Sequence, residues 1–192
     1  MEAEVHINDS TNSYTAQVNE FGELRSIDPV RDAINNGNCF DFSYYATDIA
    51  NNGYVDIYID NDATKKKQYK AKYINVQTEG DIILTSYKNP EVSEEGTTVT
   101  TYNLVSYSTT VFPVLVKHTP SVTNAGTQVA PAFRVIVPET PGASATAISE
   151  RGDEYSRYFN TDNSYLIRIQ NVSGAALAKV SIYGRLIIDG DI

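Results

Sequence analysis

The chain has 192 residues, with 15 Lys and Arg against 24 Asp and Glu, so its formal net charge is −9. Its length suffices for one domain with a sizeable core, and its 41% hydrophobic and 20% charged residues are typical of a globular protein. Phosphate repels so acidic a chain, which argues against broad nucleic-acid binding, and no apolar run approaches the roughly 20 residues that span a bilayer. One cysteine, Cys39, and two histidines, His6 and His118, leave little for a disulfide, a histidine-rich metal site or a histidine-based catalyst.

Residues 1–26 are polar and weakly patterned, and the opening residues are acidic rather than typical of a secretory signal. We interpret residues 1–35 as an N-terminal arm and residues 36–192 as the folded domain. One short helix is predicted in the arm: Asp28 caps it, Pro29 fits its first position, residues 30–34 form it, and the Asn-Asn-Gly run at 35–37 ends it.

The domain is predicted to consist almost entirely of β-strands, because apolar and polar residues alternate along most of it. In residues 54–60, Val55, Ile57 and Ile59 share one side of the strand and should face the core. Cys39 is expected to pack in a strand as a small apolar residue. The candidate strands are residues 39–45, 54–60, 69–78, 81–87, 97–105, 111–117, 133–137, 155–159, 165–172 and 177–188.

Turn signals separate these strands at short spacing, at residues 79–81, 94–96, 124–126 and 171–174. The pattern predicts an all-β fold, an antiparallel, jelly-roll-like β-sandwich with a polar N-terminal arm and one short helix. The sequence shows no evident internal repeat, and residues 138–151 are expected to form a long projecting loop.

No motif of a serine hydrolase, a phosphate-binding loop, a zinc protease or a redox dithiol occurs. His118 is expected to be an ordinary residue at a strand end. We therefore predict no catalytic residue, no cofactor and no metal site, and hence no enzyme. Oxygen-rich runs at residues 60–62 and 189–191 could bind calcium, but solvated turns are favoured there. The carboxylates that a glycosidase would require could come from Asp41, Asp56, Asp60, Glu79, Asp81, Glu150, Asp153 or Glu154, but solvation explains acidic residues on outer strand faces and in turns.

Two features favour contact with other proteins. The cluster Lys65, Lys66 and Lys67 stands out in an acidic chain, and could either protect a strand edge or dock on an acidic surface. Tyrosines recur through successive strands, which suits half-buried positions, a flat protein interface or stacking against sugar rings. These tyrosines are at positions 44, 45, 54, 58, 69, 73, 87, 102 and 107.

Three segments resemble the small head-associated or decoration proteins of tailed bacteriophages. They are residues 19–25 (NEFGELR) followed by Pro29, residues 116–127 (VKHTPSVTNAGT) and residues 163–174 (NSYLIRIQNVSG). The third is the most specific, because it joins a strand, a turn and the start of the closing strand. The chain departs from the group at its end, where residues 183–189 stand in place of an aromatic finish.

The resemblance implies a non-enzymatic virion structural protein, made in the bacterial host cytoplasm and bound to the capsid exterior. Its expected partners are the major capsid protein or another virion protein and further copies of itself, as a trimer or dimer, with no nucleic acid and no membrane. The residues expected to contact the partner are Phe21, Leu24, Arg25, Val30, Lys65, Lys66 and Lys67. The alternative is a receptor- or carbohydrate-binding module of a phage fibre or tail, which the tyrosines and the long loop at residues 138–151 favour.

Overall fold

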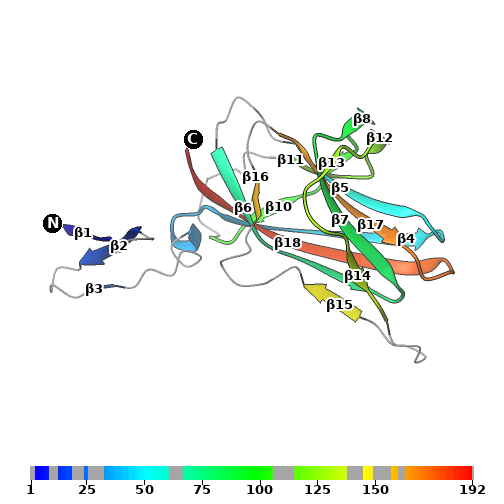
Figure 1. The fold of residues 1–192 in the computed structure, drawn as a ribbon, viewed down its shortest axis with the longest axis horizontal. Coiled ribbons are helices and arrows are strands. Elements are labelled where there is room, and N and C mark those ends of the chain that lie inside the picture. Colours follow the sequence, from blue (N-terminus) through cyan, green and yellow to red (C-terminus); the bar gives the residue numbers. More distant parts are fainter. Residues whose placement is uncertain are drawn as a thin grey trace.

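The computed structural model describes residues 3–8, 13–18, 24–25, 33–60, 67–105, 115–137, 145–148, 157–159 and 163–191 (Figure 1). Side chains are described for residues 33–60, 74–105, 115–137 and 163–188. Every strand pairing among the described residues is antiparallel.

Two sheets pack face to face, and each has its own set of strands. The first sheet has the order β10 (Thr101–Asn103), β4 (Cys39–Ile49), β18 (Leu177–Asp191), β6 (Lys67–Thr78) and β15 (Ala145–Ile148), and β16 (Arg157–Phe159) also pairs with β6. The second sheet has the order β13 (Thr127–Gln128), β7 (Ile82–Lys88), β17 (Tyr165–Asn171), β5 (Tyr54–Asp60), β11 (Leu115–His118) and β9 (Thr97–Thr98), and β14 (Phe133–Val135) also pairs with β7.

The order of the strands is that of a jelly roll. When the main strands β4, β5, β6, β7, β14, β15, β17 and β18 are counted from 1 to 8, the first sheet reads 1-8-3-6 and the second reads 2-7-4-5. The chain therefore alternates between the sheets at most steps, and β17 and β18, late in the sequence, fill the middle of each sheet. The predicted all-β sandwich is confirmed.

The core lies between the two inner faces and is continuous. Val55, Ile57 and Ile59 of β5 are buried in it, as their alternation predicts. The first sheet contributes Phe40, Phe42, Val76, Ile182 and Leu186, among others, and the second contributes Ile82, Val116, Ile167 and Ile169. At the margin of this layer, the ring of Tyr44 stacks on the ring of His118, with centroids 4.2 Å apart and an interplanar angle of 18°.

Gly184 of β18 makes room for an aromatic ring in the core. A Cβ atom at this position would lie 2.3 Å from Cε1 of Phe42, its cross-strand neighbour on β4, and 3.0 Å from Cδ1 of Ile74. A central strand with a glycine loses side-chain packing, and here the Phe42 ring fills the space instead.

Most predicted strands are present, with shifted bounds. Residues 97–105 form two short strands, β9 and β10, rather than one, because the chain crosses from the second sheet to the first between them and Val99 enters the core. Residues 145–148, inside the predicted loop 138–151, form β15, and residues 138–144 and 149–151 lie outside the described residues. Residues 111–114 and 155–156, at the starts of two predicted strands, also lie outside them.

The expectation that the chain has no internal repeat is wrong. Residues 89–99 (NPEVSEEGTTV) and 119–129 (TPSVTNAGTQV) adopt the same structure 30 residues apart (119 − 89). In each copy a residue with positive φ before a proline leads into a strand, a glycine with φ +86° ends it, and a short strand follows. The two middle strands, β8 (Glu91–Glu94) and β12 (Ser121–Asn124), pair with each other, and we call them the β8–β12 ribbon.

A local twofold relation connects the copies. Lys88 pairs with Thr127 and Gln128 with Tyr87, just as His118 pairs with Thr97 and Thr98 with Lys117. A Cβ atom on Gly96 would lie 2.1 Å from the carbonyl oxygen of His118, and one on Gly126 would lie 2.3 Å from that of Lys88, so both positions require glycine for space as well as for positive φ. The repeat escapes a sequence reading because it rests on backbone pairing and only a few shared residues, which are the Pro90, Val92, Gly96, Thr97 and Val99 of the first copy.

The described helical residues are 33–35, and the helix ends as predicted. Gly37, with φ 69°, donates its backbone N–H to the Ile34 carbonyl, and Asn38 donates to the Ala33 carbonyl, which together form a Schellman motif. The predicted cap Asp28 and Pro29 lie outside the described residues. The arm contains a small sheet of its own, formed by β1 (Ala3–Asn8), β2 (Ser13–Val18) and β3 (Leu24–Arg25) and drawn apart from the two large sheets in Figure 1. The polar sequence of the arm predicted no strand there.

Asn171 fixes the turns at one end of the sandwich. Its buried amide donates to the carbonyl oxygens of Ile49, Ala50 and Ala175, and its Oδ1 accepts from the N–H and hydroxyl of Ser173. The predicted turn at residues 171–174 is therefore also the link between the β4–β5 and β17–β18 connections. No helix among the described residues is long and apolar enough to cross a membrane.

Candidate functional site

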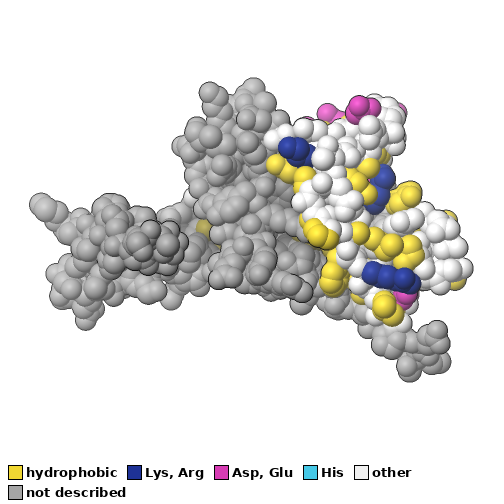
Figure 2. All heavy atoms as spheres, viewed as in Figure 1, with side chains coloured by type: hydrophobic (Ala, Val, Ile, Leu, Met, Phe, Trp, Pro, Cys, Tyr) yellow, Lys and Arg dark blue, Asp and Glu magenta, His cyan; other side chains and the backbone are white. Residues whose placement is uncertain are grey.

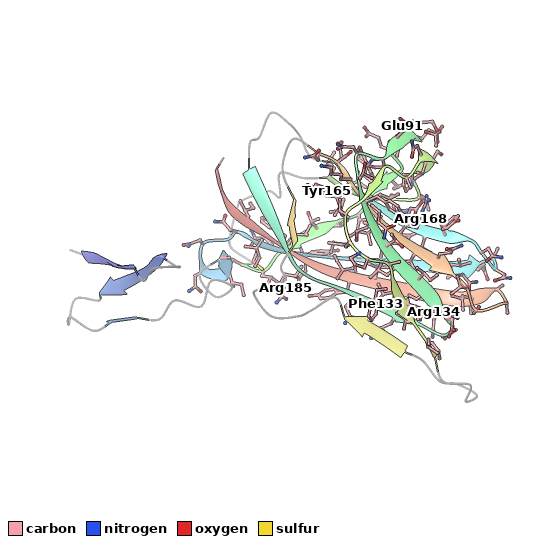
Figure 3. All side chains as sticks on the ribbon, viewed as in Figure 1. Glu91, Phe133, Arg134, Tyr165, Arg168 and Arg185 are labelled. Atoms are coloured by element: carbon pink, nitrogen blue, oxygen red, sulfur yellow. The ribbon has the colours of Figure 1, made fainter. Side chains whose placement is uncertain are left out.

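An arginine at the centre of the second sheet's outer face is held in a fixed orientation. Arg168 of β17 lies directly across from Asp56 of β5 and donates from Nε to Oδ1 at 2.9 Å and from Nη2 to Oδ2 at 2.7 Å. The two side chains are 18% and 10% exposed, so the pair is largely shielded from water. The hydrogen bonds to Asp56 raise the pKa of Arg168, so the guanidinium stays charged. Arg168 is labelled among the side chains of the sandwich in Figure 3.

Two tyrosines flank this arginine. The guanidinium carbon of Arg168 lies 4.4 Å from the centroid of the Tyr54 ring, a cation–π contact, and Tyr54 is 54% exposed. Tyr87 of β7 lies diagonally on the other side, because it pairs with Leu166 while Thr85 pairs with Arg168. We call this surface the Tyr54–Arg168 patch, and its members are Tyr54, Asp56, Thr85, Tyr87, Arg168 and Gln170.

The outer face of the first sheet carries a second pair of the same kind. Arg185 of β18 lies across from Asp41 of β4 and donates from Nε to Oδ1 and from Nη2 to Oδ2, at 2.7 and 2.8 Å. Asp41 also accepts a hydrogen bond from the hydroxyl of Tyr183, which lies two residues before Arg185 on the same face. The acceptor atoms of Asp41 are therefore used by three donors.

A buried lysine links the β8–β12 ribbon to the second sheet. Lys117 of β11 is 6% exposed, donates to Glu95 and lies 3.5 Å from Oδ2 of Asp60. Burial would lower the pKa of Lys117, but the contacts with the two carboxylates raise it, so the lysine stays charged. Its neighbour across the strand, Tyr58, has a pKa raised by burial. The cluster is a structural anchor for the Gly96 turn.

Several acidic residues differ from their expected surroundings. Asp41 and Asp56 lie on outer strand faces, as predicted, but they are shielded and paired with arginines rather than solvated. Asp60 pairs with Lys117, Asp81 lies 3.1 Å from Arg134, and Glu79 pairs with Lys179 at the surface. Glu150, Asp153 and Glu154, and residues 61–62 of one proposed calcium-binding run, lie outside the described residues.

The predicted partner-binding residues are only partly within the described structure. Phe21, Val30, Lys65 and Lys66 lie outside it, and Leu24 and Arg25 (in β3) and Lys67 (in β6) are described by their backbone alone. The contact of the arm and the lysine cluster with a partner therefore remains a prediction.

Cys39 is a packed strand residue, as predicted. It is fully buried in a small cluster with Ala33 and Ile187 at one end of the first sheet's outer face. Burial raises the pKa of its thiol from 9.0 to about 11, which makes it a poor nucleophile at neutral pH.

Large apolar side chains are exposed on both sides of the sandwich. Figure 2 shows such side chains mixed with Lys and Arg over the second sheet, and Asp and Glu side chains at the upper end, over the β8–β12 ribbon. Half-burial, expected for most tyrosines, holds for Tyr44 and Tyr87 but not for the buried Tyr58. The exposed residues are Tyr45 and Tyr102 on the first sheet and Tyr54, Leu115, Val129, Phe133 and Ile136 on or beside the second.

The described residues contain no group of three or more His, Cys, Asp or Glu side chains that could hold a metal ion. Comparison of the sequence with models of protein families and with curated proteins found no match. The sequence singled out the tyrosines but missed the two Asp–Arg pairs. Their signal was an arginine and an aspartate at outward positions of strands that only the jelly-roll order makes neighbours.

Proposed function

We propose that the chain is a non-enzymatic structural protein of a tailed-bacteriophage virion, an auxiliary or decoration protein that binds the capsid surface and stabilises it. The observation that carries the proposal is the contrast between the acidic and the apolar side chains on the sandwich surface. The shielded carboxylates Asp41 and Asp56 are engaged in bidentate ion pairs, whereas large apolar side chains are exposed on both outer faces. Such a surface suits contact with protein more than acid–base chemistry.

The expected partner is the major capsid protein or another virion protein, with further copies of this chain in a dimer or trimer. The charge of −9 favours the capsid exterior, away from packaged DNA. Production in the bacterial host cytoplasm agrees with the single, buried, unpaired cysteine. Contact is expected through four residues of the arm, Phe21, Leu24, Arg25 and Val30, helped by the lysines at 65–67.

Immunogold electron microscopy of purified particles tests the location. Antibodies raised against the full chain should label the outer surface of intact heads. A full-length triple variant, Phe21→Ala, Leu24→Ala and Arg25→Ala, should bind stripped particles more weakly than the parent chain in a co-sedimentation assay. Absence of the chain from particles would reject the proposal, and equal binding by the triple variant would reject the role of the arm.

A second candidate function is receptor or carbohydrate binding as part of a phage fibre or tail. The specific observation that favours it is the Tyr54 ring, half exposed and stacked on the fixed guanidinium of Arg168. If this function holds, an excess of the purified chain should reduce adsorption of the phage to its host, and the Tyr54→Ala variant should reduce it less. Unchanged adsorption in the presence of the parent chain would remove this candidate.

A further inference from the structure

The fixed guanidinium of Arg168 has hydrogen-bonding capacity left over. An arginine carries five N–H donors in a rigid plane, and Asp56 accepts from two of them, one on Nε and one on Nη2. Within the described structure, no other acceptor contacts the remaining donors. The side chain is 18% exposed, and the ion pair already sets the direction of the guanidinium.

Tyr54 adds an apolar surface beside these donors. One side of its ring is occupied by the guanidinium at 4.4 Å, and the residue as a whole is 54% exposed, which leaves ring surface open to solvent. The ring is therefore held in place before any ligand arrives. Both residues stand on strands of a paired sheet, β5 and β17, so binding would cost little conformational entropy.

The charge and polarity of the patch restrict its ligand. Arg168 and Asp56 cancel each other, and a chain of net charge −9 disfavours anionic ligands. The residues beside the two central ones in register are also polar, and of these Thr85 is buried and Gln170 is half-buried. The patch therefore places aromatic rings beside hydrogen-bond donors that have a fixed direction, which suits an uncharged ligand with both C–H faces and hydroxyl groups.

We infer that the Tyr54–Arg168 patch binds the pyranose ring of a neutral glycan. The C–H face of one sugar ring would lie on the open face of Tyr54, and hydroxyl oxygens of a neighbouring ring of the same glycan would accept from the free donors of Arg168. Gln170, across from Tyr54, and Tyr87, on the other side of Arg168, would meet different parts of the same glycan. This inference rests on the second candidate function above and gives its ligand class and site.

The test begins with an array of neutral oligosaccharides of glucose, galactose, mannose and N-acetylhexosamines, probed with the full chain. Each bound glycan is then titrated against variants. Tyr54→Ala and Arg168→Lys should each weaken binding by about tenfold or more, whereas Tyr54→Phe, which keeps the ring, should retain most of it. Tyr45→Ala and Tyr102→Ala are matched controls, because both remove tyrosines of similar exposure from the first sheet, and they should leave binding unchanged.

Circular dichroism and urea unfolding establish that each variant is folded. If Arg168→Lys does not fold, the Tyr54→Ala variant alone tests the inference. The inference is overturned if no neutral glycan binds, or if binding survives Tyr54→Ala unchanged. It is also overturned if the Tyr54→Ala variant sediments more slowly than the parent chain, because the patch would then be an interface between copies. Particle binding by Tyr54→Ala separates the two functions, since a decoration protein should keep it whatever the glycan result.

Discussion

The two outer faces of the sandwich carry the same ion pair in different surroundings. Asp41–Arg185 on the first sheet and Asp56–Arg168 on the second both join directly opposed residues through Nε and Nη2. In the first, the hydroxyl of Tyr183 shares the carboxylate. In the second, Tyr54 stacks on the guanidinium and leaves the carboxylate to arginine alone. The same pair is therefore built into a closed network on one face and an open surface on the other, which suggests a structural role for the first and a binding role for the second.

The largest expected loss of stability comes from a substitution that disturbs the packing of the first sheet alone. Gly184→Val would place new atoms against Phe42 and Ile74 and should destabilise the fold by about 4 kcal/mol, measured by urea unfolding. Amide NMR shifts should change around Arg185, the next residue, and much less around Arg168. The double variant Gly184→Val, Phe42→Leu should recover part of the loss. If Gly184→Val unfolded at the same urea concentration as the parent chain, this account of Gly184 would be contradicted.

The two Asp–Arg pairs should contribute unequally to the free energy of unfolding. Asp56→Ala leaves Arg168 shielded and without its carboxylate, and should cost about 3 kcal/mol of unfolding free energy. Asp41→Ala should cost less, because Nη2 of Arg185 lies 3.4 Å from the Tyr183 hydroxyl and can use it as an acceptor. The double variant Asp56→Leu, Arg168→Met should restore most of the stability, since it removes both charges. The comparison fails if Asp41→Ala is the more costly single change.

A third effect concerns alkaline pH and the first sheet alone. The folded-state pKa of Cys39 is raised from 9.0 to about 11, so its contribution to stability is complete below pH 9 and is lost as the pH rises through 11. The loss should reach about 2 kcal/mol, and the Cys39→Ala variant should show a correspondingly flatter pH dependence over this window. Tyr44 and Tyr58, whose pKa values are also raised, contribute the same to both proteins. Parallel curves for parent and variant would show that the thiol is not responsible.

The smallest effect should be that of Tyr54→Ala on stability, at about 0.5–1 kcal/mol, because an exposed cation–π contact contributes little. Tyr183→Phe, which removes a hydrogen bond to a carboxylate, should cost more. Thermal unfolding of the two variants side by side measures the difference. If Tyr54→Ala were the more destabilising, Tyr54 would be a structural residue and the contrast between the faces would disappear.

The alternation of side chains was enough to find most of the long strands. In β5 the pattern located the whole strand and its buried residues, because a strand with one face in the core must alternate. It predicted one strand over residues 97–105 where the structure has two, because the crossing between the sheets at Val99 depends on the partners of β9 and β10. It missed β8, β12 and β13 and the repeat that contains them, since these short strands are held by backbone pairing and not by an apolar face.

The candidate site shows the same limit more sharply. Tyrosines stood out by their number, but nothing local distinguished Tyr54, half exposed beside an arginine, from Tyr58, buried four residues later in the same strand. Asp56 looked like a solvated outer residue because its partner, Arg168, lies 112 residues away in the sequence.

By itself, the sequence determined the acidic charge, the all-β class, the turns with glycine at positive φ and the burial of Cys39. Each of these follows from composition or from the conformational preference of neighbouring residues. Only the tertiary structure decided which strands are neighbours, and therefore which outward-facing side chains meet. Because a jelly roll places late strands between early ones, the two Asp–Arg pairs, the Tyr54–Arg168 patch and the β8–β12 ribbon all arise from contacts between distant segments that no local pattern specifies.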